Sequence, residues 1–255
     1  MTERAAGTGE ADPARLLSAG GRVVMISGAS RGLGAAIARR LHADGYTLSL
    51  GVRDPERTRK ALGPAADSPT LVERFDATVP TTAARWVEAT LARFGRLDGL
   101  VNNAGILKRV TFDEGSEAEL DLLWEVNVKG PFRLIRLALP HLKAAGHGRI
   151  VNVASTDAKR YRDLSVSVGY AMSKHALLAL SHAARFAGWD TGVRVTALCP
   201  GAIDTELLAG LAGVTPAASQ LRPATVAEIV SLLLRLPDTA TIAELAVNTR
   251  LEPTL

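Results

Sequence analysis

Short apolar runs alternate with longer amphipathic stretches along most of the chain. The first run, residues 23–27, reads Val-Val-Met-Ile-Ser, which is typical of a strand buried on both faces of a sheet. Residues 32–43 follow with apolar positions at helical spacing and predict a helix. By the same criteria we expect further strands at residues 46–52, 71–75, 97–101, 149–154, 193–198 and 242–247. Further helices are expected at residues 55–62, 82–94, 117–145, 169–180 and 226–236.

The order of these elements favours one fold class. Strand and helix alternate with no internal repeat and no linker, which predicts an α/β protein with a single doubly wound parallel sheet of about seven strands and helices on both faces. Residues 21–255 form this domain, whereas residues 1–20 have no apolar period and predict a mobile tail. Pro131 and Pro140 lie inside the helical stretch 117–145 and are expected to bend or divide it.

Composition and charge limit the partners and the cellular location that we expect for this chain. Of the 255 residues, 47% are apolar and 22% are charged, which suits a globular chain with a buried core. The net charge of +4 is small and no run of five like charges occurs, so nucleic acid is not an expected partner. Neither a signal peptide nor a membrane-spanning apolar stretch is recognisable, and the single cysteine, Cys199, fits a reducing compartment. We therefore expect a soluble cytoplasmic protein without membrane association.

Glycines follow the first predicted strand and open the helix after it. From Gly28 to Gly34 they would let a pyrophosphate approach the backbone at a helix N-terminus, although a simple strand-to-helix bend has similar glycines. At the end of the second strand, an acid would bind a ribose 2′-hydroxyl, whereas an arginine accommodates a 2′-phosphate. Arg53 stands there and Arg31 lies in the glycine turn, so NADP is expected over NAD, even though Asp54 follows directly.

Polar and small residues after two later strands are further candidates for cofactor contacts. Asp76 follows the third strand and would meet the adenine edge, or would serve as an ordinary turn residue. Residues 102–105, Asn-Asn-Ala-Gly, follow the fourth strand, where small side chains let a cofactor pack against the backbone. Taken alone, this second segment predicts only a turn.

A tyrosine and a lysine lie four residues apart in the predicted helix 169–180. On a helix, Tyr170 and Lys174 project from the same face, one turn apart. A free phenol has a pKa of about 10 and exchanges protons poorly at neutral pH, but a close ammonium group lowers that pKa. Such a phenol can exchange a proton with an alcohol or carbonyl oxygen. The pair alone fits equally well a half-buried tyrosine beside a solvated lysine.

Six short motifs occur in an order that resembles the short-chain dehydrogenase/reductase family, in its one-domain branch with a T-G-x-x-x-G-x-G glycine motif. The resemblance covers nearly the whole chain from Arg22 onward. The motifs are Ser27-Gly28-Ala29-Ser30-Arg31-Gly32-Leu33-Gly34, Asn102-Asn103-Ala104-Gly105, Asn127, Ser155, Tyr170-x-x-x-Lys174, and Cys199-Pro200-Gly201-Ala202-Ile203-Asp204-Thr205. The resemblance implies a Rossmann-type domain that uses a nicotinamide cofactor to interconvert an alcohol and a carbonyl.

The resemblance also implies roles for the motif residues. Tyr170 would be the general acid in reduction and the base in oxidation, while Lys174 would lower its pKa and hold the nicotinamide ribose. Ser155 would hydrogen-bond the substrate oxygen, or would merely cap a strand end. Asn127 would anchor a water of a proton relay, or would merely satisfy a helix kink. With the residues above, the expected cofactor-binding set is Gly28, Ser30, Arg31, Gly32, Leu33, Gly34, Arg53, Asp76, Asn103, Ala104, Gly105, Tyr170, Lys174, Pro200, Gly201, Ile203 and Thr205.

The segment between Ser155 and Tyr170 departs from the family pattern. The two residues are fifteen positions apart, which is slightly wide, and the charged run 157–163 replaces the glycine that usually follows the serine. This insertion should border the substrate cleft. One of Lys159, Arg160 and Arg162 is therefore expected to meet an anionic group of the substrate, with a solvated loop as the alternative.

These features together predict an NADP(H)-preferring alcohol dehydrogenase or carbonyl reductase. The alternatives are an NAD-dependent dehydrogenase of the same family and a cofactor-binding sensor without turnover. The segment 205–222 should cover the substrate, and its small apolar residues indicate only a partly apolar pocket. Because the five histidines lack metal-ligand spacing, no catalytic metal is expected, and Cys199 is interpreted as structural. The resemblance implies a homodimer or homotetramer.

Overall fold

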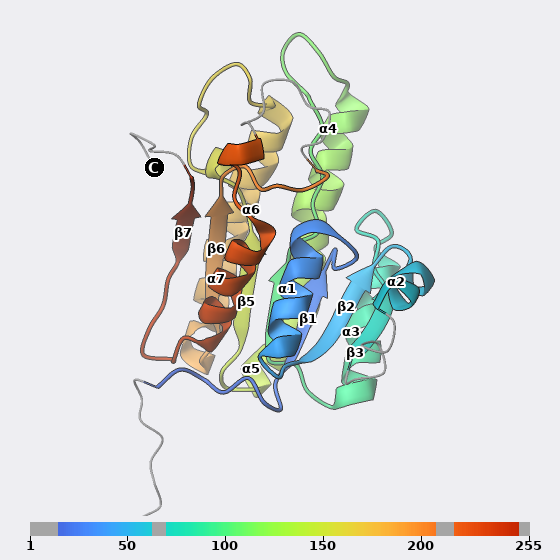
Figure 1. Ribbon diagram of the computed structural model, residues 1–255, viewed down its shortest axis with the longest axis vertical. Helices are drawn as coiled ribbons and strands as arrows, with labels where there is room; N and C mark the ends of the chain where they lie inside the picture. Colours follow the sequence, from blue (N-terminus) through green and yellow to red (C-terminus); the bar gives the residue numbers. More distant parts are fainter. Residues whose placement is uncertain (1–14, 63–69, 208–216, 250–255) are drawn as a thin grey trace, which may run out of the picture.

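A seven-stranded parallel sheet forms the centre of the computed structural model, which describes residues 15–62, 70–207 and 217–249 (Figure 1). The spatial order of its strands is β3-β2-β1-β4-β5-β6-β7. Strands β1 to β3 run outward in one direction and β4 to β7 in the other, so the sheet is doubly wound and its switch point lies between β1 and β4. The strands are β1 (Val23–Ser27), β2 (Thr47–Val52), β3 (Thr70–Arg74), β4 (Gly99–Asn102), β5 (Arg149–Val153), β6 (Arg194–Pro200) and β7 (Glu244–Val247).

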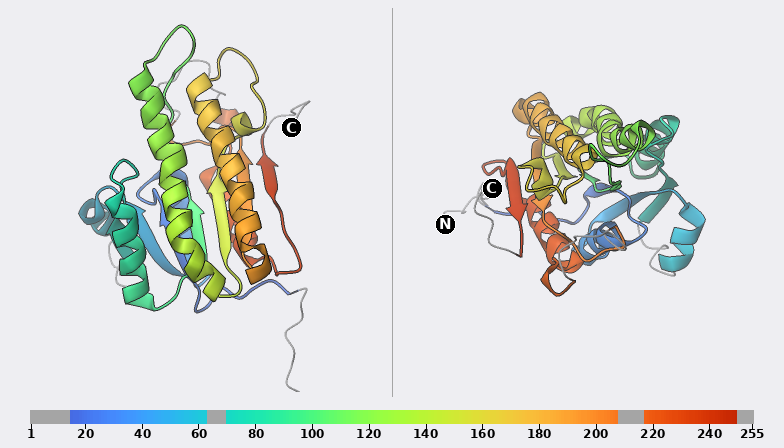
Figure 2. Two further views of the ribbon diagram at one scale, coloured as in Figure 1. Left: turned by 180° about the vertical axis from the view of Figure 1, so that it is seen from behind. Right: turned by 90° about the horizontal axis from the view of Figure 1, so that it is seen from above.

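Helices cover both faces of the sheet. Helices α1 and α7 lie on one face, and α3, α5 and α6 lie on the other, as the opposite views in Figures 1 and 2 show. Within β1, Val24 and Ile26 belong to the core under α1 and α7, while Met25 belongs to the core under α3 and α5. The helices are α1 (Gly32–Ala43), α2 (Pro55–Leu62), α3 (Thr81–Phe94), α4 (Glu117–Trp124), α5 (Gly130–Ala144), α6 (Val168–Gly188) and α7 (Pro223–Arg235). The expected fold class is confirmed.

The long helical stretch is divided at one place rather than at both of its prolines. A π-helical turn, η2 (Glu125–Lys129), separates α4 from α5 directly before Pro131. Pro140 lies inside α5 without a break, so the expectation that it divides the stretch is wrong. Pro140 and Arg136, whose carbonyl lacks its usual N–H partner, are both exposed, so water can satisfy that carbonyl.

The predicted mobile tail and the segment expected to cover the substrate are both described only in part. Residues 1–14 lie outside the described residues, but Leu17 N–H donates to the Arg235 carbonyl over 2.7 Å and Ala19 is buried in the core. Residues 208–216 of the segment expected to cover the substrate also lie outside the described residues. Ala202 precedes this gap and Leu221 follows it, and the Leu221 N–H donates to the Ala202 carbonyl over 2.8 Å.

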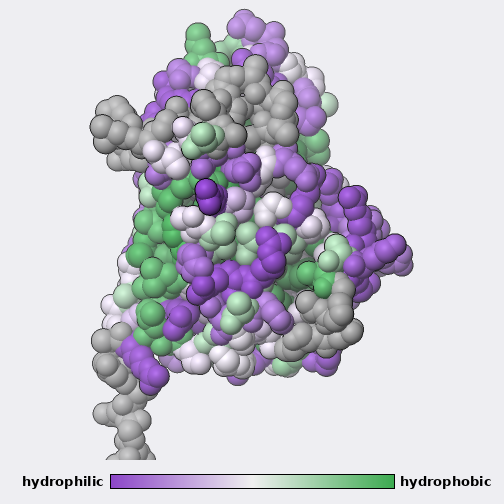
Figure 3. Space-filling view, viewed as in Figure 1, coloured by the Kyte–Doolittle hydropathy of each residue, from purple (hydrophilic) through white to green (hydrophobic). Residues whose placement is uncertain are grey.

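Hydrophilic side chains gather over the middle of the face that carries α1 and α7, and hydrophobic side chains lie along one side of it (Figure 3). Arg40 on α1 lies 2.6 Å from the Glu228 carboxylate on α7 and 2.9 Å from Asp44. Exposed pairs of this kind contribute little to stability, so the apolar contact between the two helices holds them together. In the described part of the chain, no helix is both long and apolar enough to cross a membrane.

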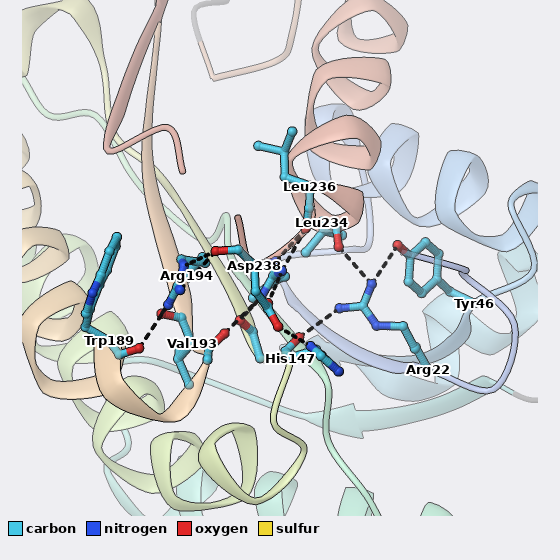
Figure 4. Close-up of polar contacts among 12 residues, drawn as sticks. Arg22, Tyr46, His147, Trp189, Val193, Arg194, Leu234, Leu236 and Asp238 are labelled. Atoms are coloured by element: carbon cyan, nitrogen blue, oxygen red, sulfur yellow. Dashed lines mark hydrogen bonds and ion pairs between the residues drawn. The ribbon is translucent and has the colours of Figure 1, made fainter. Parts of the chain in front are cut away.

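A polar network closes the amino ends of the strands (Figure 4). Arg22 precedes β1, and its guanidinium donates to the Leu234 carbonyl over 2.8 Å. Arg149, at the start of β5 and 1% exposed, donates to the Leu236 carbonyl and the Asp238 carboxylate, both over 2.7 Å. These bonds satisfy carbonyl groups at the C-terminal end of α7 that lack helical partners. The network therefore holds the C-terminal end of α7 against the amino ends of the strands.

Candidate active site

A cleft of about 420 Å³ opens at the carboxyl ends of the strands, at the switch point between β1 and β4. This is where ligands bind in open α/β sheets, because the loops after neighbouring strands meet there. Every residue in the cofactor-binding set expected from the sequence lines this cleft. It is also lined by residues outside the expected cofactor-binding set, namely Gly51, Val52, Phe75, Ala77, Thr78, Ile106, Leu122, Val126, Val153, Ala154, Ala202, Glu206 and Leu207.

The glycine turn after β1 forms one wall of the cleft. A Cβ atom on Gly34 would lie 2.2 Å from the Gly28 carbonyl oxygen, and one on Gly28 would lie 2.9 Å from the Ala104 Cα, so neither position has room for a side chain. Gly28 also has a φ of +69°, in the left-handed region that favours glycine. Asn103 Nδ2 donates to the Gly28 carbonyl over 3.2 Å. The turn is thus a tight backbone cradle at the N-terminus of α1, which fits a pyrophosphate.

The residues expected at the adenosine end lie at the mouth of the cleft. Arg31 and Arg53 are both exposed there, and Arg31 forms an ion pair with Glu206. Asp76 Oδ1 accepts hydrogen bonds from the backbone and hydroxyl of Thr78, over 3.0 and 2.7 Å. Asp76 therefore makes the contacts of an ordinary turn residue, which was the alternative to an adenine contact, and it also lines the cleft.

Tyr170 and Lys174 share one face of α6, as their spacing predicts. Helix α6 begins after Ser167, whose hydroxyl accepts from the Tyr170 N–H over 3.2 Å and caps the helix. Lys174 Nζ lies 5.6 Å from the centre of the Tyr170 ring. It donates to the Val153 carbonyl at the end of β5 over 2.8 Å. This bond fixes the ammonium group beneath the phenol, inside the cleft.

The protonation of this pair differs from the expectation that Lys174 lowers the pKa of Tyr170. Burial raises the pKa of Tyr170, the nearby charge of Asp157 raises it further, and a hydrogen bond with Ser155 opposes the shift. Burial also lowers the pKa of Lys174 to about 8, against the charges of Cys199 and Asp157. Tyr170 is thus protonated at neutral pH, the form in which a phenol can donate a proton to a carbonyl oxygen.

Ser155 and Asn127, the other two residues expected to take part in catalysis, are not among the lining residues of the cleft but lie close to this part of α6. Ser155 ends the loop after β5, where its Oγ accepts from the Asp157 N–H over 3.1 Å and caps the short 3₁₀ helix η3 (Thr156–Ala158). Asn127 lies in η2; its side chain accepts from Ile106 N–H and donates to the Ile106 carbonyl, each over 2.9 Å. Asn127 Nδ2 also donates to Ser173 Oγ on α6 over 3.0 Å. The side chain of Asn127 therefore ties the loop after β4 to α6.

The charged insertion after Ser155 is largely paired with protein groups. Lys159 forms an ion pair with Glu244 of β7, and Arg162 lies 2.9 Å from Asp163. Neither cation lines the cleft, so the expected contact with an anionic substrate remains a prediction. Asp157 was not singled out as a candidate from the sequence, yet it is half-buried close to Tyr170 and Lys174, and burial raises its pKa. In the sequence, its position two residues after Ser155 is the feature that could have marked Asp157 as a candidate.

Cys199 and the histidines are not among the residues that line the cleft. Cys199 is fully buried, and burial raises the pKa of its thiol, as suits a structural residue. Among residues 15–62, 70–207 and 217–249, no three or more His, Cys, Asp or Glu side chains are grouped so that they could hold a metal ion.

Sequence comparison places the chain among known proteins. A family profile described as short chain dehydrogenase matches residues 22–213. The chain belongs to this family. An agropine synthesis reductase of Rhizobium rhizogenes is 42% identical over 188 residues, which cover 73% of this chain and 43% of that protein. A second agropine synthesis reductase of the same organism is 38% identical over 219 residues, which cover 86% of this chain and 50% of that protein. The chain thus spans half or less of the length of these curated relatives.

Solved structures of the family share the fold. An alcohol dehydrogenase from the archaeon Thermococcus sibiricus, complexed with 5-hydroxy-NADP, matches with a TM-score of 0.81 and 32% identity, covering 91% of this chain and 99% of that chain. A 3-ketoacyl-(acyl-carrier-protein) reductase from Brucella melitensis, complexed with NADH, matches with a TM-score of 0.83 and 29% identity, covering 91% of this chain and 98% of that chain. The expected family and Rossmann-type fold are confirmed.

Proposed function

We propose that this short-chain dehydrogenase interconverts a small carbonyl compound and its alcohol, using NADP(H) in preference to NAD(H). The observation that carries the proposal is one continuous cleft that has the backbone cradle of Gly28 and Gly34 in one wall and Tyr170 with Lys174 in another. The relatives named agropine synthesis reductase and 3-ketoacyl-(acyl-carrier-protein) reductase support a carbonyl substrate.

Each part of the cleft has a task in this reaction. The glycine turn would hold the pyrophosphate, Lys174 the nicotinamide ribose, and the backbone from Pro200 to Thr205 the nicotinamide, which supplies or accepts the hydride when the cofactor is bound. Tyr170 would donate its phenolic proton to the substrate oxygen in reduction and accept it back in oxidation. Ser155, which acts on the pKa of Tyr170, would hydrogen-bond and orient that oxygen. Asn127 would anchor a water that returns the proton from solvent.

The preference for NADP(H) is supported by two cations at the mouth. Arg31 and Arg53 both line the cleft, and Val52, at the end of β2, is no acid that could bind a ribose 2′-hydroxyl. Titration of the purified protein with NADPH and NADH, followed by nicotinamide fluorescence, tests this. Tighter binding of NADPH is expected. Tighter binding of NADH would contradict the preference and favour the NAD-dependent alternative, and binding of neither would favour an interaction role without turnover.

The role of Tyr170 is tested by Tyr170→Phe, which removes the hydroxyl and keeps the ring. We expect kcat/KM to fall by at least about 100-fold, because general acid–base groups contribute on the order of 10²- to 10⁴-fold. The Kd for NADPH should stay within about twofold, since the cradle is untouched. A Phe variant that reduces a carbonyl as fast as the parent would show that another group supplies the proton.

We further propose a homodimer or homotetramer. Phe132 on α5 and Met172 and Phe186 on α6 are large apolar side chains that are 47%, 49% and 78% exposed. A second copy of the chain would remove such surface from water. Light scattering on the purified protein measures the assembly directly.

A further inference from the structure

An ion pair spans the mouth of the cleft at the place proposed for the 2′-phosphate. Arg31 stands at the N-cap position of α1, and its Nη1 pairs with the Glu206 carboxylate beyond the end of β6. The two turns touch, because a Cβ atom on Gly32 would lie 3.4 Å from the Thr205 methyl group. Both side chains line the cleft, and they are 62% and 67% exposed. Glu206 therefore holds the guanidinium that a phosphate would need.

We infer that Glu206 competes with the 2′-phosphate of the cofactor for Arg31 and thereby sets how strongly the protein prefers NADP(H) to NAD(H). The inference rests on the proposed use of NADP(H). A guanidinium binds carboxylate and phosphate oxygens with the same planar set of N–H donors, so the two anions share one partner. A phosphate beside Arg31 also meets the negative charge of Glu206, which repels it.

Only one of the two cofactors experiences this competition. NADH has a hydroxyl at the 2′ position and can bind while the Arg31–Glu206 pair stays intact. NADPH must displace the carboxylate or share the guanidinium with it. Arg53 makes no ion pair with any part of the chain that the structure describes, so it is the unopposed cation at this mouth. Glu206 should therefore weaken NADPH binding and leave NADH binding unchanged.

The test is Glu206→Gln, which removes the charge and keeps the shape. Kd values for NADPH and NADH are measured by nicotinamide fluorescence at low ionic strength. We expect NADPH to bind about two- to fivefold more tightly and NADH to bind as in the parent, since exposed ion pairs have modest strength. Glu228→Gln is the matched control, because Glu228 is also an exposed acid paired with an arginine but lies outside the cleft. It should leave both Kd values unchanged.

A double substitution identifies the partner. In an Arg31→Ala background, Glu206→Gln should no longer improve NADPH binding beyond the small gain from removing a negative charge. An unchanged ratio of the two Kd values in Glu206→Gln would overturn the inference. Weaker NADH binding in that variant would also overturn it, because Glu206 would then be holding a ribose hydroxyl. The ratio in the parent protein tests the proposed NADP(H) preference separately, since the inference concerns only its change.

Discussion

Tyr170 keeps its proton because its phenol is buried and because Asp157 disfavours a second negative charge beside it. Two groups act on the pKa of the phenol besides its burial: Asp157 raises it and Ser155 lowers it. Arg160 and Arg162 act on Asp157 in turn, because their charges oppose the effect of burial on its pKa. A protonated phenol is the form that carbonyl reduction needs.

Replacement of Asp157 by Asn should lower the pKa of Tyr170. The folded protein holds that pKa above the ordinary value, and removing a neighbouring negative charge relieves part of the shift. Oxidation needs the phenolate, so the rising limb of kcat against pH for alcohol oxidation should move to lower pH. Asp190→Asn is the control, because Asp190 is an exposed carboxylate that is not among the groups acting on the pKa of Tyr170 or Asp157. Coincident profiles for parent and Asp157→Asn would contradict the role of Asp157.

At the scale of elements, the position of α7 depends on charged groups at its C-terminal end. Asp238 follows the helix and bonds to Arg149, which is nearly inaccessible to solvent, and to His147 (Figure 4). Burial opposes ionisation of Asp238, but the hydrogen bonds and charges of Arg149 and His147 outweigh it and lower its pKa. The ionised carboxylate is therefore the form that stabilises the fold.

Asp238→Asn should lower the free energy of unfolding by about 2 kcal/mol at pH 7. Breaking a fully buried pair costs about 3 to 5 kcal/mol, but Asp238 is 32% exposed and Arg149 keeps its bonds to backbone carbonyls. A carboxyl group with a lowered folded pKa contributes stability above its unfolded pKa and loses it on acidification. The difference between parent and variant in urea unfolding should thus shrink below about pH 4. A difference that stays constant with pH would contradict this account.

Some elements could be predicted from the sequence and others could not. Strand β1 was predictable because a strand covered on both faces needs an unbroken apolar run. The π-helical turn η2 was not, since the sequence does not show that Asn127 bonds to Ile106 and Ser173, which lie far from it in the chain. Pro140 misled the prediction because its tolerance depends on which side of α5 faces water.

At the scale of the whole molecule, the cleft joins loops from both halves of the sheet. The glycine turn follows β1, Asn103 follows β4, Lys174 lies on α6 and Gly201 follows β6. A cofactor bound in this cleft contacts segments far apart in the chain, so it binds the folded state and not the unfolded chain. Binding and global stability should therefore be linked.

Saturating NADPH should raise the Tm of the protein by roughly 5 to 10 °C. A ligand at 100 times its Kd adds about 2.7 kcal/mol to the stability of the folded state. For a chain of this size, 1 kcal/mol corresponds to about 2 to 4 °C. Differential scanning fluorimetry measures the shift, and Tyr170→Phe should show the same shift because the phenol is not needed for binding. No shift with either NADPH or NADH would contradict the assignment of the cleft as a cofactor site.

Local patterns in the chain were sufficient to predict the alternation of strands and helices, the glycine cradle and the placement of Tyr170 and Lys174 on one helix face. These features depend on short-range periodicity and on glycine's lack of a side chain, and both can be recognised from residues that are close together in the sequence. Three other features follow from the packing of distant segments and could not be predicted: Asp157 lies near Tyr170, the pKa of Tyr170 is raised, and Glu206 pairs with Arg31. The burial and the charged surroundings of these side chains depend on residues distant in sequence. They become defined only when the sheet brings the carboxyl ends of its strands together.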